Sequence, residues 1–155
     1  MSNTNSKNAR ASGLTFFLKL SSFLAATLFI ASASVALASD LIVVVENIKN
    51  DQGNIRVAIF DNDKSFLKKP LDGQFLNAKP GTLLFAFKDL PNGTYAVSIF
   101  HDLNSNDKLD TNFVGKPIEP YGFSRDARGT FGPPTYDDAS FQLDEQVKTI
   151  KLSVK

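Results

Sequence analysis

Residues 90–100 read Leu-Pro-Asn-Gly-Thr-Tyr-Ala-Val-Ser-Ile-Phe, a turn followed by an alternating segment. Tyr95, Val97 and Ile99 share one face of that segment, which is the period-two pattern of a half-buried β-strand. A Leu-x-x-Gly-x-Tyr sequence leading into a strand is typical of the corner in Greek-key sandwiches, where the tyrosine hydroxyl bonds to nearby backbone. The stretch therefore indicates an antiparallel β-sandwich.

Strand signals recur along the rest of the chain, at residues 41–48, 55–60, 74–78, 82–88, 140–143 and 147–154. We expect the first two strands to form a hairpin around Gly53, which can adopt a positive φ, and the last two to form a second hairpin. No helical pattern longer than two turns is visible. The predicted fold is an all-β sandwich of immunoglobulin-like or transthyretin-like type with about seven strands, and a small closed barrel is the alternative.

The N-terminal 38 residues are typical of a targeting segment. They contain Lys7, Arg10 and Lys19, no acidic residue, and an uncharged stretch at 20–38 that ends in Ala-Leu-Ala. We expect a signal peptide that is removed on export, which leaves residues 39–155 as a single domain in the bacterial periplasm or outside the cell. An uncleaved anchor is the alternative, because about 20 apolar residues can span a bilayer.

Composition limits the classes of function. Beyond residue 38 the chain has 14 basic and 16 acidic residues, so its net charge is −2 and no basic stripe favours nucleic acid. The chain has no cysteine, which excludes disulfides, thiol catalysis and thiolate metal sites. We expect an unknown protein or small ligand as partner, and contact with a membrane only through the N-terminal segment.

Residues 102–139 show no convincing strand and are rich in Gly, Pro, Asn and Asp. A loop of this length inside a compact domain is usually functional or disordered, and its scattered aromatic residues argue for order. It opens with oxygen-bearing side chains at alternating positions, namely Asp102, Asn104, Asn106 and Asp110. Such side chains are the ligands that calcium takes, so the loop predicts a calcium site.

The predicted site is not an EF-hand and is incomplete by itself. The sixth and twelfth positions of the loop are Asp107 and Phe113, where an EF-hand requires Gly and a bidentate Glu. We expect the missing carboxylates to come from Asp137 and Asp138, at the far end of the same loop. The alternative is a metal-free Asn/Asp turn in which the side chains bond to their own backbone.

Catalysis has weaker support in the sequence. His101, the one histidine, sits beside Asp102 and could act as a base in a hydrolase that cleaves an ester or a carbohydrate. Ser124 could complete a Ser/His/Asp set with His101 and Asp137, but no nucleophile-elbow motif is present. Glu119 could pair with Asp137 or Asp138 for sugar hydrolysis. The sequence favours a non-enzymatic binding or structural module, with a hydrolase using His101 and loop carboxylates as the alternative.

Four segments carry a family resemblance, and they read Leu90-Pro91-x-Gly93-x-Tyr95-Ala96-Val97, His101-Asp102-x-Asn104-x-Asn106-x-Lys108-x-Asp110, Gly115-x-Pro117-x-Glu119-x-Tyr121-Gly122-Phe123-Ser124 and Phe131-Gly132-Pro133-Pro134-x-Tyr136-Asp137-Asp138-Ala139. With them, the chain from about Leu41 to Val154 resembles the bacterial family catalogued as domain of unknown function 2141. The resemblance implies an exported β-sandwich and no established activity. Asp107 and Pro120 depart from the family pattern, where Gly is commoner, and the first departure bears on the calcium site.

Overall fold

The computed structural model describes residues 38–155, so residues 1–37 of the predicted targeting segment lie outside the described part of the chain. Its elements are β1 (Ala38–Ile48), β2 (Asn54–Phe60), β3 (Asp72–Asn77), β4 (Gly81–Pro91), β5 (Gly93–Asp102), β6 (Tyr121–Phe123), the 3-10 turn η1 (Ser124–Asp126), α1 (Tyr136–Ala139), β7 (Phe141–Leu143) and β8 (Val147–Ser153). The fold is all-β, as predicted. Between residues 38 and 155, no helix has the length and apolar character needed to cross a bilayer.

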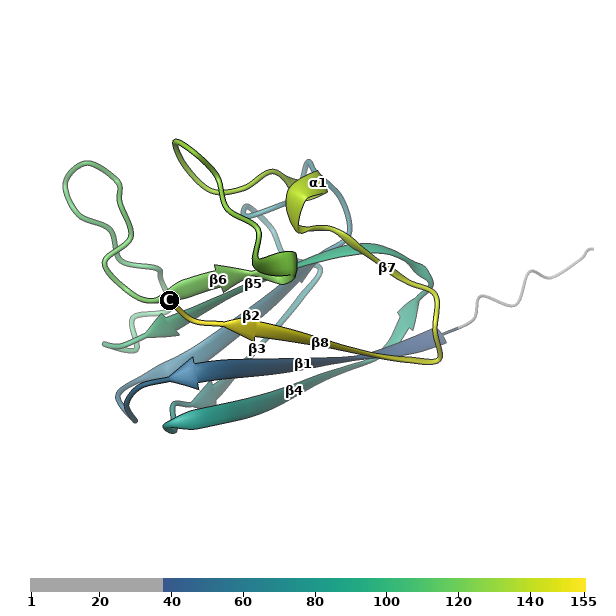
Figure 1. Ribbon diagram of the computed structural model, residues 1–155, viewed down its shortest axis with the longest axis horizontal. Helices are drawn as coiled ribbons and strands as arrows, with labels where there is room; N and C mark the ends of the chain where they lie inside the picture. The colour runs from purple at the N-terminus through teal and green to yellow at the C-terminus, as the bar shows by residue number, and fades with distance from the viewer. Residues whose placement is uncertain (1–37) are drawn as a thin grey trace, which may run out of the picture. The chain divides into compact units, whose positions relative to one another are not determined.

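The strands form two facing sheets (Figure 1). The smaller sheet has the order β4-β1-β8, and the larger has the order β3-β2-β5-β6 with β7 paired to the first residues of β5. All pairs are antiparallel except β1 with β8, which run parallel. The architecture is therefore a two-layer sandwich, as the alternating strands predicted.

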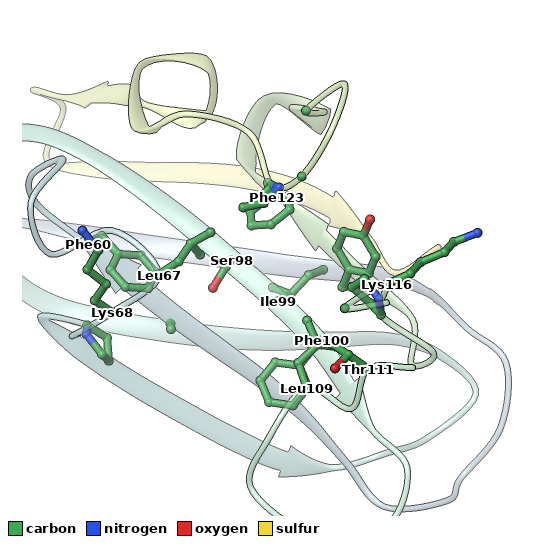
Figure 2. A pocket seen from close by; sticks show the side chains of 18 of the residues that line it. Phe60, Leu67, Lys68, Ser98, Ile99, Phe100, Leu109, Thr111, Lys116 and Phe123 are labelled. Atoms are coloured by element: carbon green, nitrogen blue, oxygen red, sulfur yellow. The ribbon is translucent and has the colours of Figure 1, made fainter. Parts of the chain in front are cut away.

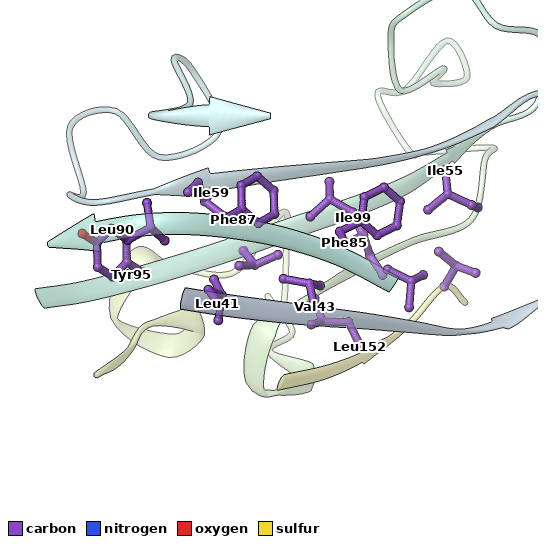
Figure 3. Close-up of a cluster of buried hydrophobic side chains, with 14 of the residues drawn as sticks. Leu41, Val43, Ile55, Ile59, Phe85, Phe87, Leu90, Tyr95, Ile99 and Leu152 are labelled. Atoms are coloured by element: carbon purple, nitrogen blue, oxygen red, sulfur yellow. The ribbon is translucent and has the colours of Figure 1, made fainter. Parts of the chain in front are cut away.

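The core lies between the sheets and is filled by alternate residues of each strand (Figure 3). β4 illustrates the pattern, because Phe85 and Phe87 are buried while Leu84 and Ala86 face solvent. The other main contributors are Leu41, Val43 and Val45 of β1, Ile55, Val57 and Ile59 of β2, Tyr95, Val97 and Ile99 of β5, and Leu152 of β8. The period-two pattern of the sequence thus identified the buried faces correctly.

The predicted tyrosine corner is present where β4 passes to β5. The Tyr95 hydroxyl donates a hydrogen bond of 2.7 Å to the carbonyl of Pro91, and its ring is buried in the core. Burial raises the pKa of the Tyr95 hydroxyl, and Asp61 adds to that rise. The corner fixes the point at which the chain leaves the small sheet and enters the large one.

Both predicted hairpins are wrong. β1 pairs with β4 and β8, whereas β2 pairs with β3 and β5, so the turn around Gly53 crosses between the sheets. β7 and β8 likewise belong to different sheets. Alternation reports which face of a strand is buried, and that face is the same whether the next strand is a neighbour or lies in the opposite layer.

The long loop is more regular than the sequence predicted, because it contains β6, η1 and α1. β6 pairs with β5, and it also approaches the chain after β8: Tyr121 and Lys155 exchange two backbone hydrogen bonds of 3.2 Å. Gly122 permits this approach, since a Cβ there would lie 2.5 Å from the Ser153 carbonyl oxygen. One side of the sandwich is therefore bridged, although the sheets remain two distinct layers.

A second apolar cluster covers part of the outer face of the large sheet. Phe66, from the β2–β3 connection, packs edge-on against Phe60 and against Tyr136 of α1, with ring centroids 5.3 and 5.8 Å apart. Ala96, Phe123 and Ala139 complete the buried part of this cluster. Through Phe123 and Tyr136, the long loop of residues 102–139 thus packs back onto the sheet.

Replacing Tyr95 with Phe tests the corner. The change removes one part-buried hydrogen bond and keeps the ring, so we expect the free energy of unfolding in urea to fall by about 1 kcal/mol. Tyr121→Phe is the matched control, because no hydrogen bond of the Tyr121 hydroxyl is formed within residues 38–155. Equal stabilities of the two variants would contradict a stabilising role for the corner.

Candidate functional site

Asp102, the last residue of β5, is a completely buried carboxylate. Its Oδ2 accepts hydrogen bonds from Nε of Arg56 at 2.8 Å and from the amide of Asp107 at 3.0 Å, and its Oδ1 accepts from the amide of Asn106 at 3.0 Å. Arg56 lies on the neighbouring strand β2 and also pairs with the Asp107 carboxylate. A buried charge is tolerated when it is paired and hydrogen-bonded in this way.

The other predicted ligands of the loop converge on Asp110. Nδ2 of Asn104 donates to one carboxylate oxygen of Asp110 at 2.7 Å, and Nδ2 of Asn106 donates to the other at 3.0 Å. Oδ1 of Asn104 accepts from the amide of Asn106, and Oδ1 of Asn106 accepts from the amide of Lys108. The loop is thus closed by Asn and Asp side chains that bond to each other and to their own backbone.

Glu119 clamps the two ends of this loop. Its Oε1 accepts from the amide of Leu103 at 2.8 Å, and its Oε2 accepts from the amide of Asp110 at 2.9 Å. The side chain is buried, so both amides would lose their acceptor without it. From the sequence, Glu119 was expected only as a catalytic carboxylate, and this positioning role was not predicted.

His101 anchors the start of the loop from the core side. Its ring is buried, and Nε2 lies 2.7 Å from the carbonyl oxygen of Gln52 in the β1–β2 connection. Gly53 follows with a φ of 64°, and a Cβ there would lie 1.9 Å from the Asp102 carbonyl oxygen. Only glycine allows the connection to pack this closely against the end of β5.

Asp137 and Asp138 are not part of this site. Asp138 caps α1, where its Oδ2 accepts from the hydroxyl of Thr135 at 2.6 Å, and these Thr135 hydrogen bonds lower the pKa of the Asp138 carboxyl. The helix is held to the first residues of β5, because the Tyr136 hydroxyl donates to the Thr94 carbonyl at 2.7 Å. Thr94 is eight residues from Asp102 along one strand, a distance of about 26 Å. The structure therefore does not bring these carboxylates to the loop that they were expected to complete.

Ser124 is a structural hydroxyl. It is buried, accepts from the amide of Val97 at 2.9 Å, and donates to the carbonyl of Ala139. His101 lies four residues beyond Val97 on β5, about 13 Å further along the strand. Ser124, His101 and Asp137 do not form a triad, and Glu119 and Asp138 are likewise held at different ends of β5.

Beside the loop, the outer face of the large sheet is hollowed into a groove of about 840 Å³ (Figure 2). Its floor includes Ala58, Ser98 and Phe100 of β2 and β5. Its walls come from the β2–β3, β5–β6 and η1–α1 connections, which supply mostly apolar side chains, among them Leu67, Leu109, Val114 and Phe131. Tyr121 of β6 also lines the groove. This volume lies in the range of small-molecule sites.

Two lysines are among the residues that line this groove. Lys68 and Lys116 are on opposite sides of the floor at Ser98 and Phe100 (Figure 2). Neither forms an ion pair with a carboxylate in the described part of the chain. Asp107 also borders the groove, but its carboxylate pairs with Arg56.

The comparison with known families agrees with the resemblance seen in the sequence. A family model described as an uncharacterised protein conserved in bacteria, domain of unknown function 2141, matches residues 43–151. The chain belongs to this family. The match runs from β1 into β8, so it includes both sheets, the loop of residues 102–110 (the Asp102 loop) and the groove. No curated protein and no solved structure matches the chain.

For this family member, the site residues that sequence reasoning missed are Arg56 and Glu119. Arg56 is distant from the loop in sequence, and its guanidinium also lies over the ring of Phe75 at 5.0 Å. Its position opposite Phe100 in the β2–β5 register is what brings it to Asp102, and that register was not visible in the sequence. Within residues 38–155, no group of three or more His, Cys, Asp or Glu side chains is arranged to hold a metal ion.

Glu119→Gln tests the clamp with almost no change of shape. The amide offers only one acceptor oxygen, so either Leu103 or Asp110 loses its partner, and we expect a loss of about 1–3 kcal/mol in the free energy of unfolding. Hydrogen exchange should become faster at one or both of these amides.

Glu145→Gln is the control for this experiment, because Glu145 pairs with Lys148 on an exposed surface. We expect that change to stay within about 0.5 kcal/mol. Unchanged protection of Leu103 and Asp110 in Glu119→Gln would show that the loop is ordered by other contacts.

Proposed function

We propose that the protein is a non-enzymatic binding module that holds a small amphipathic ligand in the groove on the outer face of the large sheet. The observation that carries this proposal is the groove itself, formed between three connections and floored by β2 and β5. The family has no assigned activity that would direct the choice, so the proposal rests on the geometry.

The lining indicates the chemistry of the ligand. Apolar and aromatic side chains favour an apolar body, because burying such surface is favourable by about 25 cal/mol per Å². Lys68 and Lys116 offer cations without an ion-pair partner in residues 38–155, which favours an anionic end. Export to the periplasm or beyond remains the prediction of the N-terminal sequence.

Hydrolysis has less support from the same residues. His101 is buried against the Gln52 carbonyl, and the hydroxyl of Ser124 is committed to backbone groups of β5 and α1. A general base must reach a bound substrate. Neither side chain lines the groove, whereas the residues that do line it are suited to binding.

Calorimetric titration with anilinonaphthalene sulfonate, an apolar dye with an anionic group, tests the groove. Ser98→Trp fills the floor, so we expect the dissociation constant of the dye to rise at least about tenfold. Lys68→Ala and Lys116→Ala should each weaken binding by about three- to tenfold through loss of a charged contact.

Thr82→Trp, at an exposed position of β4 in the other sheet, is the control for added aromatic surface. Its dye affinity should equal that of the unchanged chain. A dye that binds the unchanged chain and Ser98→Trp equally well would place its site elsewhere and refute the groove proposal.

Calcium binding by the Asp102 loop is a second proposal. Rotating the amides of Asn104 and Asn106 by half a turn would point their Oδ1 atoms at Asp110, which is the arrangement a cation there requires. The rotation would break the hydrogen bonds that these Oδ1 atoms accept from the amides of Asn106 and Lys108, so cation binding must compensate for them. The donor set is smaller than expected, because Arg56 and two amides occupy the Asp102 carboxylate and because Asp137 and Asp138 lie elsewhere. The remaining ligands favour the weak affinities of extracellular calcium modules, in the millimolar range.

Thermal unfolding in EDTA and in calcium at about ten times its dissociation constant tests this site. Binding at that level adds about 1.4 kcal/mol, so we expect the midpoint to rise on the order of 5 °C. Asp110→Asn should remove the rise, whereas Asp144→Asn, in the exposed turn before β8, should keep it. An identical midpoint in EDTA and calcium would leave the self-bonded turn as the explanation of the loop.

A further inference from the structure

Two loop tips on one side of the sandwich carry phenylalanine side chains that are almost wholly exposed. The exposed fraction is 99% for Phe113, in the β5–β6 connection, and 103% for Phe131, in the η1–α1 connection. Val114, beside Phe113, is 69% exposed. Both connections rise from the same side of the domain (Figure 1), and Val114 and Phe131 border the same groove. Large apolar side chains exposed in this way mark surfaces that contact a partner or a membrane.

Both tips are built as tight turns. In the first, Oδ1 of Asn112 accepts from the amides of Val114 and Lys116 at 3.1 and 2.9 Å, and Gly115 has a φ of 81°. In the second, a Cβ on Gly129 would lie 2.3 Å from the Gly132 carbonyl oxygen, so the chain folds closely on itself. Because these turns are already ordered, their backbones would lose little conformational entropy when the phenylalanines dock.

Both tips carry an excess of positive charge. Residues 111–118 contain Lys116 and no exposed carboxylate, because they include no Asp or Glu at all. Residues 127–134 contain Arg128 and likewise no acidic residue. Arg128 pairs with the neighbouring Asp126 at 3.4 Å, and Lys155 contacts the same carboxylate at 2.8 Å, so this group of three keeps one excess positive charge. An apolar point with an adjacent cation complements the interface of a bilayer, where acyl chains lie beneath anionic headgroups.

We propose that these two tips dock the domain onto an anionic lipid bilayer, with Phe113 and Phe131 inserted at the acyl boundary and with Lys116 and Arg128 among the headgroups. Two narrow protrusions suit a fluid interface, whereas a protein partner of standard size would need a continuous surface of about 800 Å² on each side. The sequence predicted membrane contact only through the N-terminal segment, so this surface is an addition. It does not depend on ligand binding in the groove.

The chain contains no tryptophan, so single tryptophans can report each position separately. Phe113→Trp and Phe131→Trp place the reporter at the tips. Leu84→Trp is the control, at a residue that is 64% exposed on β4 in the other sheet. With vesicles of phosphatidylglycerol and phosphatidylethanolamine, we expect blue-shifted emission and quenching by doxyl-labelled lipids at both tips and no change at residue 84.

The full chain can be used, because these reporters sense local insertion and not attachment through residues 1–38. Adding Lys116→Glu and Arg128→Glu to either tip reporter should raise the lipid concentration for half-maximal shift at least about tenfold, since each cation near an anionic surface contributes about 1 kcal/mol. Emission that is unchanged at both tips, or that shifts equally at residue 84, would overturn the proposal. Circular dichroism confirms that each variant is folded, and the dye titration without vesicles tests the groove separately.

Discussion

Asp102 is a fully buried carboxylate at the end of β5, and its charge must be compensated within the fold. The compensation comes from Arg56 on β2 and from two amides of the following loop. One residue therefore connects the register of the large sheet to the conformation of the loop. Removing one partner of such a buried pair typically costs about 3–5 kcal/mol, because the other charge remains buried. The clamp of Glu119 and the close packing of Gly53 both depend on that same strand end.

The outer face of the large sheet is divided between this polar network and the apolar cluster around Phe66. The cluster covers Phe60 and Ala96, and the loop network covers Arg56 and Asp102. The groove lies over the strand positions between them, at Ala58, Ser98 and Phe100. The groove is therefore bounded by three connections that are anchored at different points of one sheet. At the β5–β6 tip, the Asn112 side chain accepts hydrogen bonds from the amides of Val114 and Lys116, so this turn is held by its own contacts.

Sequence reasoning succeeded where the signal is local. The alternating pattern identified the buried residues of β4 and β5, and the corner sequence placed the Tyr95 hydroxyl against nearby backbone. It failed where the answer depends on which distant strand becomes a neighbour. β1 and β2 were expected to form a hairpin but lie in opposite layers. Asp137 and Asp138 were expected beside the Asp102 loop but lie in helix α1 at the other end of β5.

The sequence alone determined the all-β class, the family, the buried faces of the strands and the cluster of oxygen-bearing residues from Asp102 to Asp110. These features depend on side-chain periodicity and on contacts within a few residues. Only the tertiary structure decided the pairing of the strands, the approach of Arg56 to Asp102 and the groove between the connections. The physical reason is that a strand buries the same face against any partner of suitable shape, so the partner is selected by the packing of the whole domain.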